Sequence, residues 1–190
     1  MGDRLTGVGT EIDPERLANP TLAFLRDYWH AKRGDRAMPS RADIRPSELK
    51  EHLGSVCLLE VLPNLSDFRY RLIGGLVTQY FLTDTTGKTV TDAFAPVGEG
   101  AIKGMKAILR KTANAKVPIR SYGDADWLAP GFEEFDTIFL PLSDDGERVS
   151  MILNGFVFDK PTVMMAREIA RANGGKLQVA PTTRVLSKNS

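Results

Sequence analysis

The sequence predicts an α+β domain built on a five-stranded antiparallel sheet that carries helices on one face. Five apolar segments of strand length support this class, at residues 55–62, 68–74, 116–122, 133–142 and 148–158. Short polar turns join the first two segments and the last two, as in antiparallel hairpins. Between the first two and the last three of these segments, residues 99–115 have the spacing of apolar residues that is typical of a helix.

Size and composition limit the class of protein further. A length of 190 residues with 42% hydrophobic content suits one domain with one substantial core. The net charge of +1 gives no electrostatic sign of a nucleic-acid partner or an anionic membrane surface. The sequence has neither an apolar run of bilayer length nor the apolar centre of a secretory signal. We therefore expect a cytoplasmic protein that binds neither nucleic acid nor membrane.

The first element is a helix over residues 20–33, with Asn19 as its N-cap, Pro20 at its first position and Gly34 after its end. Its apolar surface is rich in aromatic side chains and must pack on the domain or on a second copy of the chain. We expect a homodimer whose interface includes Leu22, Phe24, Leu25, Tyr28 and Trp29.

The middle of the chain reads as a shorter helix from Pro46, then a hairpin of the first two strands, then a short helical or irregular piece. A turn follows that ends in Gly87, Lys88 and Thr89, the last three residues of a phosphate-binding P-loop. Leu82 stands where that loop needs a glycine, and Pro96 and Gly98 oppose a helix after it. The turn is therefore expected to be structural.

The helix over residues 99–115 is the best defined of the central helices. Its spacing places Ile102, Met105, Ile108 and Leu109 inward and Lys103, Lys106, Arg110 and Lys111 outward. The basic face could contact an acidic partner or could simply be solvated. The strands at 133–142 and 148–158 are apolar on both faces, so something must cover the second face of the sheet. The helix over residues 20–33 is the obvious candidate.

The chain divides into four expected parts, which are a tail with an amphipathic helix (1–34), the main domain (35–160), a C-terminal helix (161–175) and a mobile tail (176–190). Eight acidic residues between 121 and 147 lack calcium-loop spacing, so we expect a solvated edge and no metal site. His30 and His52 have no companion ligands or nucleophile in the pattern, so no catalytic residues are predicted.

Three stretches carry a resemblance to a known family. They are "RGDRAMPSRADIRPSEL" (33–49), "DFRYRLIG" with "TDTTGKTV" (67–90) and "FLPLSDDGERVSMILNGFVF" (139–158). In these stretches the sequence resembles PAS domains, in particular a bacterial branch of short single-PAS proteins. The resemblance implies strand order two, one, five, four, three, with a small-molecule pocket or a packed core between the sheet and the helices. It also implies that Gly87 and Lys88 belong to the turn before the long helix.

The resemblance gives no cofactor. Photochemical flavin binding in this family uses a cysteine in an Asn-Cys-Arg motif, and the matching region here has none. Haem binding often uses a histidine on the long helix, and residues 99–115 contain none. We therefore expect no cofactor and no enzymatic activity.

The sequence thus predicts a sensory or regulatory module for signal transduction that binds a small apolar ligand, a signalling protein partner or both, and that acts through self-association. The side chains that the strand and helix periods direct inward, together with one aromatic residue in a loop, predict a ligand site. Its residues are Tyr70, Leu72, Phe81, Ile102, Met105, Leu109, Trp127 and Phe139. A small α+β enzyme, such as an isomerase or hydrolase, and a ligand-free scaffold with a packed core remain the alternatives.

Overall fold

The fold is built on one antiparallel sheet of six strands in the order β1-β4-β5-β6-β2-β3. The computed structural model describes residues 8–81, 84–124 and 132–161. The strands are β1 (Gly9–Ile12), β2 (Val56–Val61), β3 (Phe68–Ile73), β4 (Ile119–Asp124), β5 (Phe132–Leu142) and β6 (Met151–Pro161). The five expected strands are confirmed, and counted from β2 they take the expected order two, one, five, four, three.

The sixth strand corrects the expected count of five. β1 lies in the segment that we expected to be a tail, and it pairs with β4 from Gly9↔Tyr122 to Ile12↔Ile119. It spans only four residues, and its partner is about a hundred residues away in the chain. Its stability comes from long-range pairing, for which a four-residue sequence carries no clear local signal.

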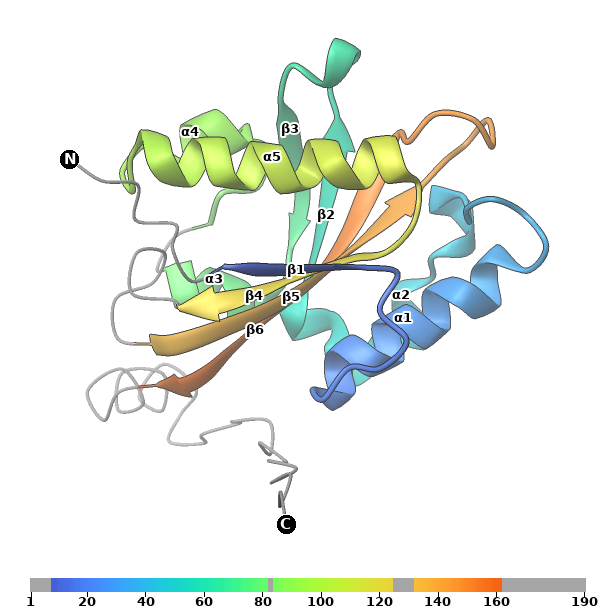
Figure 1. Cartoon of the computed structure of the whole chain (residues 1–190), viewed down its shortest axis with the longest axis horizontal. Helices are drawn as coiled ribbons and strands as arrows, with labels where there is room; N and C mark the ends of the chain where they lie inside the picture. Colours follow the sequence, from blue (N-terminus) through green and yellow to red (C-terminus); the bar gives the residue numbers. More distant parts are fainter. Residues whose placement is uncertain (1–7, 82–83, 125–131, 162–190) are drawn as a thin grey trace.

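Three helices lie on one side of the sheet, as expected (Figure 1). They are α3 (Gly75–Phe81), α4 (Val90–Phe94) and α5 (Glu99–Ala115). The bounds of α5 match the prediction. α4 was not expected so close to Pro96, but Thr89 caps it by accepting a hydrogen bond from the Asp92 amide and the helix ends before the proline.

The turn before α4 is structural. Gly87 has φ +86°, a conformation that glycine adopts freely. Its amide donates to the carbonyl of Tyr70 at 2.7 Å, and the Lys88 amide donates to the Thr85 carbonyl at 3.0 Å. These amides bond within the chain, so they do not form a phosphate cradle.

The opposite face of the sheet is covered by α1 (Pro20–Arg33), as the apolar character of both strand faces predicted (Figure 1). The Asn19 side chain caps this helix by accepting from the amides of Thr21 and Leu22. The Trp29 indole N–H donates to the Pro141 carbonyl at 2.7 Å, at a fully buried position.

This packing corrects the predicted dimer interface. Leu22, Leu25 and Trp29 are fully buried within their own chain and cannot meet a second copy in this conformation. The prediction assumed that the helix carried more apolar surface than one sheet face covers, whereas the sheet and the segment 46–55 together cover nearly all of it. Only Phe24 and Tyr28 of the five remain half-exposed. Phe24 stacks on His52, with 4.2 Å between the ring centroids, and the Tyr28 hydroxyl donates to Glu48.

The connection from α1 to β2 wraps one end of the sheet through short helical turns. The Pro39 carbonyl accepts from the Ser143 amide, and Met38 is buried beside it in sequence. This connection contains 3₁₀ turns at Arg41–Asp43 and Lys50–Ser55 and, between them, α2 at Pro46–Leu49; a further 3₁₀ turn at Pro63–Leu65 joins β2 to β3. The expected helix from Pro46 is therefore one α-helical turn continued as 3₁₀, with a break at Lys50, where φ is +32°.

The expected C-terminal helix and tail lie outside the described residues. Within the described part of the chain, no helix combines the length and the apolar composition that crossing a bilayer requires.

Candidate functional site

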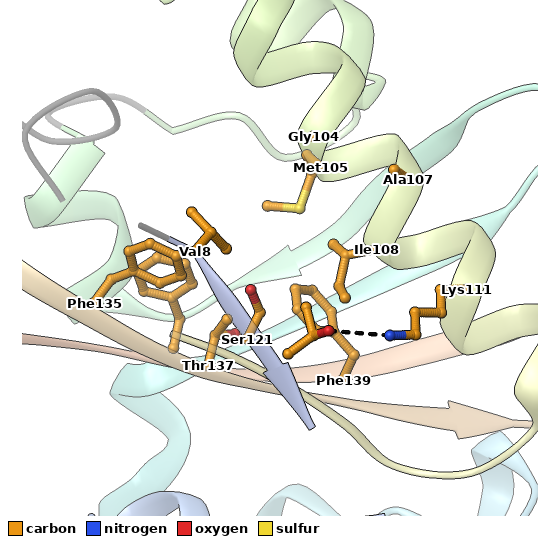
Figure 2. A pocket seen from close by; sticks show the side chains of 12 residues that line it. Val8, Gly104, Met105, Ala107, Ile108, Lys111, Ser121, Phe135, Thr137 and Phe139 are labelled. Carbon is orange, nitrogen blue, oxygen red and sulfur yellow. Dashed lines mark hydrogen bonds between the residues drawn. The ribbon is translucent and has the colours of Figure 1, made fainter. Parts of the chain in front are cut away.

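A cavity of about 310 Å³ lies between α5 and the sheet and is partly open to solvent. We call it the α5 cleft. Its lining is mostly apolar and comes from β1, α5, β4, β5, β6 and the residue before β1 (Figure 2). The lining residues are Val8, Thr10, Gly104, Met105, Ala107, Ile108, Lys111, Ser121, Phe135, Thr137, Phe139 and Phe156.

The floor of the cleft is set by the two-residue period of the strands. Phe135, Thr137 and Phe139 alternate along β5 and therefore point to the same side, toward α5. Phe156 reaches the same side from β6, and its ring stacks near that of Phe135 with centroids 6.0 Å apart. The floor is thus a row of aromatic rings interrupted by one hydroxyl.

The roof is the underside of α5. Met105 and Ile108 lie one turn apart and point down toward the strands (Figure 2). Gly104 and Ala107, which directly precede these two residues in the chain, line the cleft with almost no side chain. Larger side chains at these two positions would fill the space, so the cleft exists partly because glycine and alanine occupy them.

Of the eight predicted ligand-site residues, Met105 and Phe139 line the cleft. Tyr70 and Leu109 are buried but lie in the core outside the lining, and Ile102 is partly buried against that core. The Phe81 side chain is not described, and Trp127 lies outside the described residues.

Leu72 was predicted to point inward and is instead 37% exposed. The pairing of β2 with β3 shifts register between Leu58 and Leu59, where Tyr70 opposes Leu59 but Leu72 opposes Leu58. This bulge inserts one residue into β3 and reverses the side to which the following residues point. The strict alternation assumed from the sequence therefore fails after Tyr70.

Several lining residues were missed. Phe135 shares its parity with Phe139, so the alternation that selected one could have selected both. Ile108 was placed inward but was left out of the site. Val8 and Thr10 depend on the position of β1, for which the sequence offered no signal.

Three polar groups of the lining differ in how they are used. The Thr137 hydroxyl donates to the Gly155 carbonyl at 2.8 Å and accepts from the side-chain amide of Asn154 at 2.6 Å, so both its donor and an acceptor position are used. The Lys111 ammonium donates to the Thr10 hydroxyl at 3.0 Å. Ser121 is 5% exposed, and none of the hydrogen bonds described for the chain uses its side chain.

Most of the basic side chains of α5 bind other parts of the same chain. Lys106 forms an ion pair with Asp67 at 3.2 Å, with both side chains largely buried. Arg110 donates to the Leu65 and Ser66 carbonyls, and Lys111 binds Thr10. Burial opposes ionisation of Asp67, but hydrogen bonds from Thr91, the Phe68 amide and Lys106 outweigh it and lower its pKa. Most of this face is therefore not free for a partner.

A second ion-pair network lies on the other face of the sheet, under the edge formed by β1 and β4. Arg120 donates two hydrogen bonds of 2.9 Å to Asp136 and one of 3.1 Å to Glu11. The bonds to Asp136 raise the pKa of Arg120, so its guanidinium stays charged. Glu11 thus fastens β1 to β4 from the side away from the cleft.

The site offers little for acid–base or metal chemistry. Burial raises the pKa of the Tyr70 hydroxyl far above its usual value, and this hydroxyl lies outside the cleft. Burial raises the pKa of Cys57 to about 12. Among the described residues, no group of three or more acidic, histidine or cysteine side chains is placed to hold a metal ion.

The fold is an α+β domain with an antiparallel sheet and a cleft beneath its longest helix, and comparison with known families agrees with it. A family model described as a PAS domain matches residues 17–156, well over half of the chain. The chain therefore belongs to the PAS domain family, whose members are generally sensory rather than catalytic. The match begins before α1 and so includes the helix on the second face. No curated protein and no solved structure matches the chain.

Proposed function

We propose that this chain is a sensory or regulatory module that binds a small, mostly apolar molecule in the α5 cleft. The observation that carries the proposal is the cleft itself, with its aromatic floor and its flexible Met105 in the roof. Its volume of about 310 Å³ corresponds to about ten water molecules and lies at the lower end of ligand sites. Such a lining suits a compact apolar ligand.

Signalling is proposed to pass through β1. Val8 and Thr10 line the cleft, so a ligand would touch the residues in and just before this edge strand. Beyond β1 the chain runs into α1, and Arg26 of α1 donates to the Pro14 and Glu15 carbonyls of the connection. A ligand that displaces β1 would therefore also move the connection to α1, the helix on the opposite face of the sheet.

The partner that reads this change is proposed to be a second copy of the chain or another signalling protein. Ile12 on β1 is 59% exposed and Tyr122 on β4 is 36% exposed, both at the β1 edge of the sheet. Exposed apolar side chains beside an edge strand are typical of contact surfaces. A cytoplasmic location remains a prediction from the sequence.

Native mass spectrometry of the intact chain, purified from its own cells, tests the proposal. We expect the wild-type protein to carry a small molecule that is released on denaturation. A Met105→Trp variant, which fills the cleft, should carry none. If both proteins are free of ligand and the variant is also strongly destabilised, the space is part of a packed core and the chain is a scaffold.

A further inference from the structure

The charge at one end of the α5 cleft indicates what kind of apolar molecule it takes. We propose that the ligand is a small apolar monocarboxylate whose carboxylate is bound by Lys111 and Thr10. This inference rests on the proposed function and adds the polar group of the ligand. In Figure 2, Phe135 and Val8 lie at one end of the cleft and Lys111 lies at the other.

Lys111 is a cation with no acidic partner among the residues that the structure describes. Its only described bond is the one that it donates to the neutral Thr10 hydroxyl, at 3.0 Å. Lys106 on the same helix shows the contrast, because its ammonium pairs with the Asp67 carboxylate. The bond between Lys111 and Thr10 lies at the solvent-exposed mouth of the cleft. An ammonium there without an acidic partner can make a charge-assisted hydrogen bond to an anionic ligand group whose apolar body lies in the cleft.

Two hydroxyls add hydrogen-bonding capacity to the cleft. Thr10 accepts from Lys111, so its own O–H remains able to donate to a carboxylate oxygen. Ser121 lines the cleft at 5% exposure, its side chain takes part in none of the hydrogen bonds described, and its hydroxyl points into the space under α5 (Figure 2). A carboxylate at the Lys111 end would meet an ammonium and the Thr10 hydroxyl together.

The rest of the lining restricts the ligand to one charge. A second carboxylate at the far end would lie among Phe135, Phe156 and Val8, where no described group of the lining could neutralise it. Burying such a charge without a partner is strongly unfavourable. A cationic amphiphile would place its charge beside Lys111 and be repelled. An apolar body with a single carboxylate is the remaining match.

Calorimetric titration of the intact chain with four probes tests this. Decanoate and phenylbutyrate carry a carboxylate on an alkyl and an aryl body, and decanol and decylamine replace it by a neutral or a cationic group. We expect both carboxylates to bind at least about tenfold more tightly than decanol, as one charge-assisted hydrogen bond provides. The tighter of the two carboxylates shows whether the body is alkyl or aryl. Decylamine should bind more weakly than decanol.

The variants identify the residue responsible. Lys111→Met should abolish the preference for decanoate over decanol, whereas Lys111→Arg should retain it. Lys103→Met removes an exposed cation from the same helix and should change neither affinity. The inference is overturned if decanol binds as tightly as decanoate, or if Lys111→Met leaves decanoate binding intact. If none of the four probes binds the wild-type chain, the proposed apolar site fails as well.

Discussion

Gly155 on β6 lies against Leu22 and Leu25 of α1, and replacing it by alanine tests that packing. A Cβ atom at this position would lie 2.4 Å from Leu25 Cδ1, 3.1 Å from Leu22 Cδ2 and 3.2 Å from Ile138 Cγ2. The first distance is far inside van der Waals contact, so Leu25 must change rotamer or α1 must move away from the sheet.

Overpacking of this kind typically costs about 1–3 kcal/mol. Alanine also restricts the unfolded chain and so returns about 0.4–1 kcal/mol. Because the closest atom is the end of a flexible side chain, partial relief is available. We therefore expect Gly155→Ala to lower the free energy of unfolding by about 1–2 kcal/mol.

Urea denaturation followed by tryptophan fluorescence measures this loss, since Trp29 lies in the same packed face. Gly100→Ala is the control, because a Cβ there meets nothing within 4 Å and stability should not fall. Leu25→Ala should partly relieve the clash, so the double variant should lose at least about 0.5 kcal/mol less than the sum of the single variants. Gly155→Ala at or above wild-type stability, with additive double-variant energies, would refute the placement of α1.

Three further predictions concern the cleft, an ion pair and a buried hydrogen bond. If the cleft is open, Met105→Trp should fill it at a cost below about 2 kcal/mol in urea unfolding, and a larger loss would favour a packed core. Asp67→Asn should destabilise the protein by about 1–3 kcal/mol at neutral pH, because it leaves Lys106 without its counter-charge. Because the pKa of Asp67 is lowered in the folded state, the difference in free energy of unfolding between wild type and Asp67→Asn should be full above about pH 4 and vanish as pH falls through the folded-state pKa. An equal difference at pH 7 and at low pH would contradict this. Trp29→Phe should cost about 1–3 kcal/mol, since it leaves the Pro141 carbonyl without its donor, and unchanged thermal stability would show that this bond adds nothing.

The sequence predicted the fold where the local pattern was strong and consistent. α5 was expected over the residues that it occupies, because its apolar and charged residues alternate with helical spacing. The two-sided apolar character of β5 and β6 predicted that helix 20–33 would cover the second face, which the burial of Leu22 and Leu25 confirms. In both cases the pattern of apolar residues within one segment was enough to predict its structure or its burial.

The site was harder to predict because it depends on relations between distant segments. One bulge opposite Leu58 and Leu59 turned Leu72 outward, and a single sequence gives no sign of a register shift in a partner strand. Lys111 was expected to point to solvent, but β1 lies beside α5 and brings Thr10 to it. Because β1 was not predicted, the sequence identified Met105 and Phe139 as lining residues but not the polar end of the cleft.

Methyl NMR during titration with decanol tests the central claim, that an apolar molecule enters the cleft beneath α5, most directly. Met105 and Ile108 line the cleft, whereas Met38 is buried in the core without lining it. The account predicts saturable shifts of the Met105 and Ile108 methyl signals with an unchanged Met38 signal, and no such shifts for Ile108 in Met105→Trp. Shifts spread evenly over all three residues, or none at the solubility limit of decanol, would contradict it.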